Sequence, residues 1–387
     1  MQQPRTLDFI YFDAGGGHRS AALALQSVIE AEGRNWQVRL VNLQEVLDPL
    51  DIFRKVTGIR LQDVYNLVLA KGWTLGSPYL LPCMHAIIRF YHPDQVKLLR
   101  RFWNQRRPDM VVSLVPNFNR ALFQSLNQAL PGVPLVTVLT DLADYPPHFW
   151  IEKQSQYLVC GTERAVEQAR QMGHPETSVF RTSGMILRPQ FYATPLLDRA
   201  QSRRALGLDP ALPTGLVLFG SEGSNVMYSL AKRLGNGKAN LQLIMICGRN
   251  KSLRERLSRL PTRNKLVIEG FTREIPHYMQ LADFLIGKPG PGSISEALAM
   301  GLPVIVERNA WTLPQERYNA DWLEAQGAGI VLRSFRHIEK AVADLLGSQR
   351  LAAMKEKIQS LENRAVFEIP PILEEIFARQ SVHAAVR

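Results

Sequence analysis

The residues with the clearest chemistry follow the first apolar run of the sequence. Asp13, three glycines and His18 stand between a strand-like segment at 8–12 and a helical pattern at 21–32. Glycines allow a ligand close to the backbone, and the following helix N-terminus offers free N–H groups, as anion or sugar-phosphate binding requires. A tight turn that needs glycine only for steric reasons is the alternative. His18, with an ordinary pKa near 6.5, could accept a proton at neutral pH or cap the local backbone.

Two common phosphate-binding motifs do not fit this loop. No Gly-Lys-Ser/Thr follows the glycines, which excludes a Walker loop. A dinucleotide-binding fold ends its second strand with an acidic residue for the ribose, whereas the second predicted strand ends at Asn42. A nicotinamide-dependent oxidoreductase is therefore disfavoured.

The second half of the chain contains further loops of this kind. Gly220–Ser224 follows an apolar run and can bring backbone N–H groups to a phosphate, and Cys247–Asn250 follows the next predicted strand. Lys288 and a Pro-Gly-Pro-Gly-Ser segment precede a helix with Glu296 in its first turns, an arrangement suited to a diphosphate and to the two hydroxyls of a ribose. Glu296 could instead complement the helix dipole. Residues 315–319 then open a helix whose polar groups can share one face, as a sugar would require.

The elements that must position these residues alternate along the whole chain. Short apolar, β-branched runs alternate with helical patterns, which is typical of βαβ units and a parallel sheet. Strands are predicted at 8–12, 37–42, 110–115, 134–140, 157–160, 179–182, 215–219, 241–246, 265–269, 283–286, 303–306 and 328–332.

Residues 185–213 contain four prolines and no continuous strand pattern, which places a domain boundary near 185–195. We therefore predict an α/β protein with two doubly wound Rossmann-like domains, 1–188 and 189–370, and a tail at 371–387. Ligands of such sheets bind at the carboxyl ends of the strands, so the site is expected in the cleft between the domains.

The composition is that of a globular protein with a positive surface. Of 387 residues, 46% are hydrophobic and 21% charged, and 46 Lys and Arg against 35 Asp and Glu give a net charge of +11. This charge favours phosphates, nucleic acid or an anionic membrane. The three cysteines are far apart, which disfavours disulfides and a structural zinc site, and no apolar run is long enough to span a bilayer. We expect a cytoplasmic protein that associates at most peripherally with the inner face of a membrane.

Residues 64–107 are the part of the sequence best suited to a membrane surface. Only Lys71 and Arg89 carry a charge between 64 and 91, a stretch rich in aromatic residues. Apolar residues then alternate with five cations, namely Lys97, Arg100, Arg101, Arg106 and Arg107. Apolar side chains beside basic ones suit an anionic bilayer, although an ordinary helix with a solvated cationic face has the same pattern. No nucleic-acid-binding module is recognisable, so nucleic acid is not expected as a partner.

Several of these motifs together resemble those of a known family. They are Gly-Gly-Gly-His-Arg-Ser at 15–20, Gly184–Pro189, Cys247–Lys251, Gly270-Phe271 and Lys288–Ala297. In this order they resemble the motifs of the monogalactosyldiacylglycerol synthase and processive diacylglycerol glucosyltransferase family. They are more distantly similar to the lipid I N-acetylglucosaminyltransferase of peptidoglycan synthesis. The matches extend from residue 13 to about 332 and so cover most of the chain.

The resemblance implies a GT-B fold and inverting transfer of galactose or glucose from a UDP-sugar to a diacylglycerol-like lipid. The absence of an Asp-x-Asp motif leads us to expect no metal, and no other cofactor is expected. By this match His18 is the general base, and Asp13 supports it or positions the acceptor. Glu296 would hold the ribose, Phe271 would lie by the uracil, and Gly290, Gly292 and Ser293 would face the diphosphate. Gln315, Glu316 and Asn319 would lie near the transferred sugar. The further candidates for donor binding are Gly16, Gly17, Gly220, Gly223, Arg249 and Lys288.

Two departures from the family pattern concern the substrates. Tyr145–Trp150 replaces the Cys-His-Pro-Thr-Trp of the plant members, and the loop at 220–224 contains fewer glycines. The acceptor could therefore be a polyprenyl-linked sugar, or the chain could bind a nucleotide sugar without catalysis. For the reaction type, the sequence contains no Asp-x-Asp motif for a metal-bridged donor. Retaining enzymes that resemble this fold usually have a second Glu eight residues before the Glu that binds the ribose. In this sequence that position is Lys288, which favours inversion.

Overall fold

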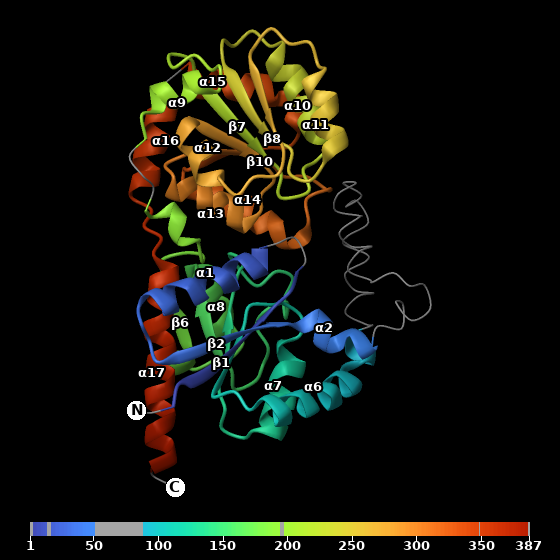
Figure 1. Cartoon of the computed structure of the whole chain (residues 1–387), viewed down its shortest axis with the longest axis vertical. Helices are drawn as coiled ribbons and strands as arrows, with labels where there is room; N and C mark the ends of the chain where they lie inside the picture. The colour runs from blue at the N-terminus through green and yellow to red at the C-terminus, as the bar shows by residue number, and fades with distance from the viewer. Residues whose placement is uncertain (1–2, 14–16, 51–87, 194–196, 348, 386–387) are drawn as a thin grey trace. The chain divides into compact units, whose positions relative to one another are not determined.

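The computed structural model describes residues 3–13, 17–50, 88–193, 197–347 and 349–385 (Figure 1). The candidate Gly16 and residues 64–87 of the predicted membrane-binding stretch lie outside the described residues. The chain divides into two compact units. Of the residues that the structure describes, those up to Pro189 and those from Asn363 onward form unit 1, and those from Gln190 to Glu362 form unit 2.

Unit 1 is built on a six-stranded parallel sheet with the strand order β2-β1-β3-β4-β5-β6. The strands are β1 (Arg5–Tyr11), β2 (Trp36–Asn42), β3 (Met110–Ser113), β4 (Leu135–Val138), β5 (Tyr157–Cys160) and β6 (Val179–Arg181). The helices are α1 (Gly17–Ala31), α2 (Leu43–Leu47), α6 (His92–Arg106), α7 (Asn119–Ala129), α8 (Glu163–Gln171) and α17 (Ala365–Ala385). Short 3₁₀ turns lie at Asp48–Leu50 and Glu176–Ser178, and a third, Pro189–Phe191, lies at the boundary with unit 2.

Helices cover both faces of this sheet, which explains why its strands are continuous apolar runs. Leu25 of α1 and Leu373 of α17 pack on one face. Leu99 and Trp103 of α6, with Leu122 of α7, pack on the other. A polar side chain within these strands therefore needs a partner, and unpaired polar groups are left to the loops at the ends of the strands.

Unit 2 repeats the design with the strand order β12-β11-β10-β7-β8-β9, again parallel throughout. Its strands are β7 (Thr214–Leu218), β8 (Gln242–Ile246), β9 (Leu266–Glu269), β10 (Phe284–Gly287), β11 (Val304–Glu307) and β12 (Gly329–Leu332). Its helices are α9 (Arg199–Ala205), α10 (Val226–Gly235), α11 (Lys251–Ser258), α12 (Ile275–Leu281), α13 (Pro291–Ala299), α14 (Pro314–Ala325), α15 (Ile338–Leu346) and α16 (Arg350–Gln359), with a 3₁₀ turn at Phe335–His337.

The predicted fold class is confirmed, and each predicted strand is observed. The largest difference is at β1, which begins at Arg5 rather than at residue 8. None of the helices among the described residues has both the length and the apolar character that crossing a bilayer requires.

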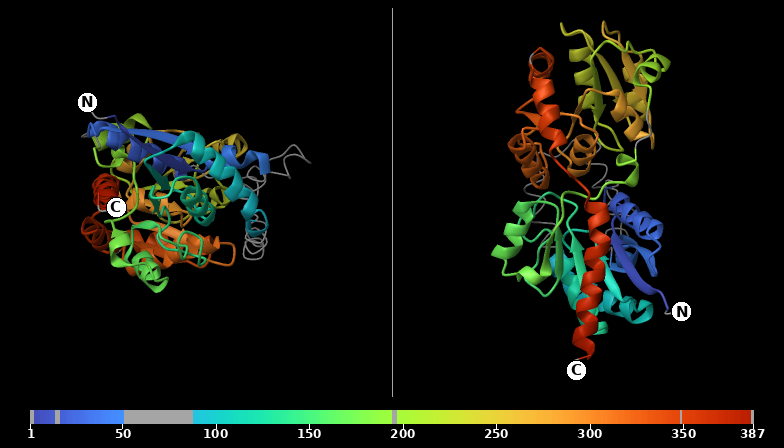
Figure 2. Two further views of the ribbon diagram at one scale, coloured as in Figure 1. Left: turned by 90° about the horizontal axis from the view of Figure 1, so that it is seen from below. Right: turned by 90° about the vertical axis from the view of Figure 1, so that its left-hand side faces the viewer.

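The C-terminal segment differs from the prediction. We predicted residues 363–370 in the second domain and 371–387 as a tail, but Asn363–Arg387 belongs to unit 1. Ile369, Leu373 and Phe377 lie on one face of α17 and are buried in the core of unit 1, where Figure 2 shows this helix in red. The backbone N–H of Ser183 also donates to Glu368 at 2.7 Å. The apolar spacing of four residues is the helical signal that explains this docking.

A buried carboxylate ties the first strand to the basic helix α6. Asp8 lies in the middle of β1 and has no exposed surface. Its carboxylate accepts hydrogen bonds from Arg39 at 2.6 Å and from Arg106 Nε at 3.0 Å. A buried carboxylate needs such partners, because an unpaired charge in the interior is strongly destabilising. Arg106, which we predicted as a membrane-facing cation, therefore has a structural role.

We expect Arg106→Gln to lower the free energy of unfolding by about 1.5 to 3 kcal/mol, the range for a lost hydrogen bond to a charged group, because Arg39 still pairs with Asp8. Arg100→Gln is the matched control, because Arg100 is exposed on the same helix. Its effect should stay within about 0.5 kcal/mol. Urea unfolding followed by circular dichroism measures both variants, and equal stabilities would contradict the structural role of Arg106.

Candidate active site

His18 lies at the carboxyl end of the unit 1 sheet, in the first turn of α1. Its Nδ1 is 3.0 Å from the hydroxyl of Thr140, which follows β4. The His18 ring lies between two aromatic side chains, with ring centroids 6.4 Å from Phe12 and 6.0 Å from Trp150. The imidazole is thus held by the hydroxyl of Thr140 and by aromatic contacts with Phe12, which follows β1, and Trp150, which lies in the loop between β4 and β5.

This environment determines the protonation state of His18. Burial lowers the pKa of His18 from 6.5 to about 4, and a hydrogen bond to the backbone of Leu114 opposes this shift only in part. The imidazole is therefore neutral at pH 7. When Nδ1 carries the proton and donates to Thr140, Nε2 is the nitrogen that can accept another.

Asp13 lies in the same loop but has a different environment. Its carboxylate pairs with Arg19 at 3.2 Å, and both side chains are exposed. Gly17 is the first residue of α1 and so lies in unit 1 beside His18, whereas the other described candidates for donor binding lie in unit 2.

The loop between β4 and β5 holds Trp150 against His18. Trp150 Nε1 donates to Asp141 at 2.9 Å, and Trp150 N donates to Asp144 at 2.6 Å. Asp144 also accepts from His148 N at 3.0 Å. Burial raises the pKa of Asp144, although these backbone donors partly offset that effect. The loop is the segment that departs from the plant sequences, and its carboxylates serve to shape it.

In unit 2, the loops after β7 and β8 approach each other closely enough to require glycine. Gly223 has φ +61°, and a Cβ there would lie 2.5 Å from the carbonyl oxygen of Cys247. Gly248 has φ +59°, and a Cβ there would lie 2.0 Å from the carbonyl oxygen of Ser221. The backbone N–H of Arg249 donates to that same carbonyl at 2.8 Å. Even with fewer glycines than expected, these two loops form one unit.

Arg249 and Phe271 form an exposed pair beside these loops. The guanidinium of Arg249 lies 4.8 Å from the centroid of the Phe271 ring, and Phe271 is 52% exposed. Arg249 also pairs with Glu222 at 2.9 Å. An exposed aromatic ring with a cation on it is a suitable surface for stacking a planar base.

The loop between β10 and α13 carries the third group of candidates. Gly290 is the N-cap of α13, so Gly292 and Ser293 lie in its first turn, and Glu296 follows on the same helix, half-buried. The Nζ of Lys288 pairs with Glu316 Oε1 at 2.8 Å. A Cβ on Gly290 would lie 3.4 Å from Lys288 Cε.

The start of α14 supplies the remaining candidates. Gln315 and Glu316 lie in its first turn, and the side chain of Asn319 donates to the carbonyl of Pro289 at 2.9 Å. Glu316 thereby joins the Lys288 group, and Asn319 contacts the same loop.

Several residues that contact His18, Trp150 or Arg249 had no predicted role. Thr140, Asp141 and Trp150 had no assigned role, although Thr140 ends a predicted strand and therefore had to lie at the edge that carries His18. Glu222, the partner of Arg249, had no sequence signal of its own. Over the described residues, no cluster of His, Cys, Asp and Glu is arranged to hold a metal ion.

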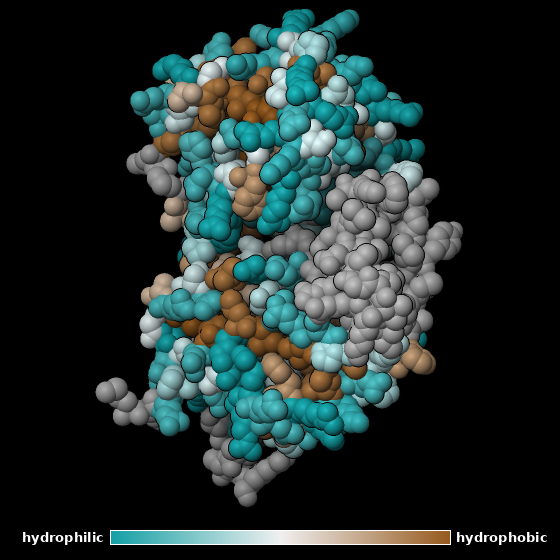
Figure 3. Space-filling model, turned by 45° about the vertical axis from the view of Figure 1, so that its right-hand side comes forward, coloured by the Kyte–Doolittle hydropathy of each residue, from teal (hydrophilic) through white to brown (hydrophobic). Residues whose placement is uncertain are grey.

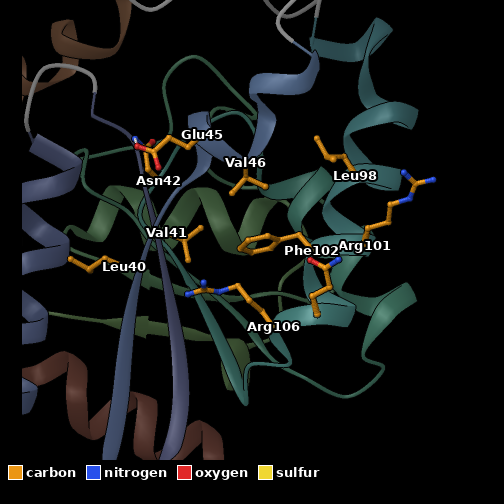
Figure 4. Close-up of a pocket in the computed structure, with 10 residues that line it drawn as sticks. Leu40, Val41, Asn42, Glu45, Val46, Leu98, Arg101, Phe102 and Arg106 are labelled. Carbon is orange, nitrogen blue, oxygen red and sulfur yellow. Dashed lines mark hydrogen bonds between the residues drawn. The ribbon is translucent and has the colours of Figure 1, made fainter.

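A pocket of about 500 Å³ lies elsewhere in unit 1, between the end of β2, α2 and α6 (Figure 4). Its lining combines apolar side chains with two arginines, two amide side chains and the acidic Glu45. The lining residues are Leu40, Val41, Asn42, Glu45, Val46, Leu98, Arg101, Phe102, Gln105 and Arg106. An apolar floor with a cation at the rim suits an amphiphilic ligand better than a sugar.

Comparison with known proteins identifies the family. Residues 214–368 match the model of the glycosyltransferase family 28 C-terminal domain. The chain is 32% identical to "Probable monogalactosyldiacylglycerol synthase 3, chloroplastic" of Oryza sativa subsp. japonica, over 96% of this chain and 74% of that protein. It is 28% identical to monogalactosyldiacylglycerol synthase 1 of Arabidopsis thaliana, over 98% of this chain and 72% of that protein.

Solved structures agree on the fold. MurG of Acinetobacter baumannii matches with a TM-score of 0.61 at 14% identity, covering 96% of this chain and all of that chain. HepE of Anabaena in complex with UDP matches with a TM-score of 0.54 at 14% identity, covering 97% and 100%. From the sequence relatives and this fold, the chain belongs to the monogalactosyldiacylglycerol synthase family and is a hexosyltransferase with the GT-B fold.

Proposed function

We propose that this enzyme transfers glucose or galactose from a UDP-sugar to the hydroxyl of a diacylglycerol-like lipid, with inversion and without a metal ion. The observation that carries the proposal is the neutral His18, which Thr140 holds at the carboxyl end of the unit 1 sheet. Relatives named for synthesis of a galactolipid support the lipid acceptor, and HepE in complexes with UDP and UDP-glucose supports the donor.

In this proposal His18 acts as the general base. Nε2 takes the proton of the acceptor hydroxyl while the hydroxyl oxygen bonds to the anomeric carbon of the donor. The bond from that carbon to the UDP oxygen breaks, and UDP leaves with the electron pair. A single displacement of this kind inverts the anomeric configuration, and it needs no second carboxylate at the position of Lys288.

The charge on the leaving diphosphate is met by unit 2. The N-terminus of α13 offers the N–H groups of Gly292 and Ser293, and Lys288 adds a cation beside Gly290. Glu296 accepts hydrogen bonds from the ribose in this scheme, and the uracil lies against Phe271 and Arg249. These groups can replace a divalent cation in stabilising the developing charge.

The direct test is an assay with labelled UDP-glucose and UDP-galactose on vesicles that contain diacylglycerol, with excess EDTA. We expect a labelled glycolipid whose yield EDTA does not change, because Lys288 and α13 supply the counter-charge. Loss of product with EDTA, restored by magnesium or manganese, would contradict metal independence. Product formed only with a polyprenyl-linked sugar would show that this sugar, and not diacylglycerol, is the acceptor. UDP binding without turnover on any lipid would show that the protein is a non-catalytic nucleotide-sugar-binding module.

We expect His18→Ala to lower the turnover rate by about 10² to 10⁴, the usual contribution of a general base. The affinity for UDP should stay within a few-fold of the wild type.

Glu296→Ala is the complementary variant: it should weaken UDP binding about ten- to a hundred-fold through loss of charge-assisted hydrogen bonds. Steady-state kinetics and calorimetric titration separate the two effects.

The pH profile gives this prediction a second readout. Because burial lowers the pKa of His18 to about 4, the base stays neutral and active well below its ordinary pKa of 6.5. The value of kcat/KM should therefore persist as the pH falls through 6 and decline only toward 4. An acid limb centred near pH 6.5, or near wild-type turnover in His18→Ala, would contradict the assignment.

We also propose that α6 docks the enzyme on the anionic inner face of a membrane. Lys97, Arg100 and Arg101 share the exposed face of α6, and Phe90 just before this helix is 77% exposed. Arg101 also lies at the rim of the amphiphilic pocket. On the face drawn in Figure 3, brown apolar patches lie among hydrophilic side chains on both units.

We expect Lys97, Arg100 and Arg101 changed together to Gln to weaken sedimentation with anionic vesicles, since each such cation contributes about 1 kcal/mol at a membrane surface. Arg106 stays unchanged because it pairs with Asp8. Lys232, Arg233 and Lys340 of unit 2, all exposed, give a control triple variant of the same charge. Equal vesicle binding by both triple variants would place the docking surface elsewhere.

A further inference from the structure

Two contacts tie the loop between β10 and α13 to the start of α14. Lys288 Nζ pairs with Glu316 Oε1 at 2.8 Å, and Asn319 Nδ2 donates to the Pro289 carbonyl at 2.9 Å. Glu316 and Asn319 are three residues apart, so they lie on the same face of α14. Neighbouring residues of the loop are thus held by neighbouring positions of one helix.

The ion pair is asymmetric in its exposure. The side chain of Glu316 is 10% exposed, whereas that of Lys288 is 42% exposed. A carboxylate this deeply buried needs its cation, so the pair persists without ligand. An ammonium group has three N–H donors, however, and Lys288 can hold Glu316 while it donates to a second anion.

Lys288 lies where the candidate diphosphate loops meet. A Cβ added to Gly290 would lie 3.4 Å from Lys288 Cε, and one added to Gly220 would lie 3.9 Å from the same atom. The stem of Lys288 therefore passes between the loop after β7 and the loop before α13. Its ammonium joins these loops to Glu316, at the helix whose polar residues were assigned to the sugar.

Asn319 has no surface with which to touch a sugar. Its exposure is 0%, and among the residues that the structure describes its Oδ1 has no hydrogen-bond partner. The single bond from Nδ2 to Pro289 therefore orients the amide, because the flipped amide would set two oxygens against each other. Asn319 acts on the position of the loop that carries Lys288.

We propose that the Lys288–Glu316 pair couples recognition of the diphosphate to recognition of the hexose, and that Asn319 is a positioning residue without sugar contact. The proposal rests on the UDP-sugar donor proposed above. Lys288 donates both to Glu316 and to the diphosphate. When Lys288 also donates to the diphosphate, its attraction to Glu316 weakens. Glu316 then accepts a hydrogen bond from a hexose hydroxyl, which replaces part of the lost stabilisation of its carboxylate.

This coupling predicts that removing a charge from the site tightens the binding of UDP. With UDP alone, no hydroxyl compensates Glu316, and its negative charge opposes that of the diphosphate. Glu316→Gln should therefore tighten UDP binding, by about two- to five-fold if the pair has the strength of a partly exposed salt bridge. The same variant should lose most of the extra affinity that the hexose gives UDP-glucose over UDP.

The variants of Asn319 test whether this residue positions the loop or contacts the sugar. If it positions the loop, Asn319→Ala should weaken UDP and UDP-glucose by the same factor, about two- to ten-fold for one lost hydrogen bond. If it touched the sugar, only UDP-glucose would be weakened. Asn319→Asp, which keeps the size but sets an acceptor against the Pro289 carbonyl, should act in the same direction as Asn319→Ala.

The experiment is calorimetric titration of UDP and of UDP-glucose into the full chain without acceptor lipid. The variants are Glu316→Gln, Asn319→Ala and Asn319→Asp. Glu324→Gln is the matched control, because Glu324 is exposed on the same helix and its removal changes the net charge equally. Its two affinities should equal those of the wild type. Thermal unfolding of each variant verifies that it is folded, and Asn319→Asp replaces Asn319→Ala if the latter is not.

The results separate this inference from the proposed function. Tighter UDP binding with a reduced hexose increment in Glu316→Gln, and equal losses in the Asn319 variants, would support it. Weaker UDP binding by Glu316→Gln, or a loss in the Asn319 variants confined to UDP-glucose, would overturn it. Wild-type protein that binds neither UDP nor UDP-glucose would instead overturn the proposed donor.

Discussion

The pairing of parallel strands with both faces covered is the constraint on which the rest of this structure depends. Such a sheet excludes polar side chains from its faces unless they are paired, as Asp8 is with Arg39 and Arg106. Chemistry is left to the loops at the carboxyl ends of the strands. His18 after β1 and Thr140 after β4 meet at this edge in unit 1, and Gly220 after β7 and Lys288 after β10 meet in unit 2.

Burial then determines what each group at these edges can do. The same desolvation that lowers the pKa of His18 makes Glu316 dependent on Lys288. Burial makes His18 a neutral base. Burial of Glu316 means that its carboxylate needs a cation beside it. In the proposed donor site, a diphosphate would share the ammonium group of Lys288 with Glu316, so that its binding would be linked to the pairing of charges within unit 2.

The sequence predicts the elements better than the contacts. Strands of this kind are short apolar runs, so their positions follow from local pattern, and the glycine loops follow from their place between strand and helix. The contact of Thr140 with His18 joins residues 122 positions apart, and no local pattern specifies it. α17 was misassigned because its apolar face at Ile369, Leu373 and Phe377 does not reveal which sheet it covers. The candidate roles of Glu296 and Gln315 stay predictions.

The positive charge of the chain also shows that contacts cannot be predicted from the sequence alone. A net charge of +11 suggests an anionic partner, but several of the 46 Lys and Arg side chains are paired with acids within the fold. Arg106 neutralises Asp8, and Arg199 and Arg203 neutralise Asp283, whose carboxylate lies 2.6 Å and 2.8 Å from them. Arg249 and Lys288 pair with acids beside the candidate donor loops. The exposed cations of α6 are different because their face of the helix points to solvent. Charge available to a membrane is thus decided by burial and pairing, so its location matters more than its sum.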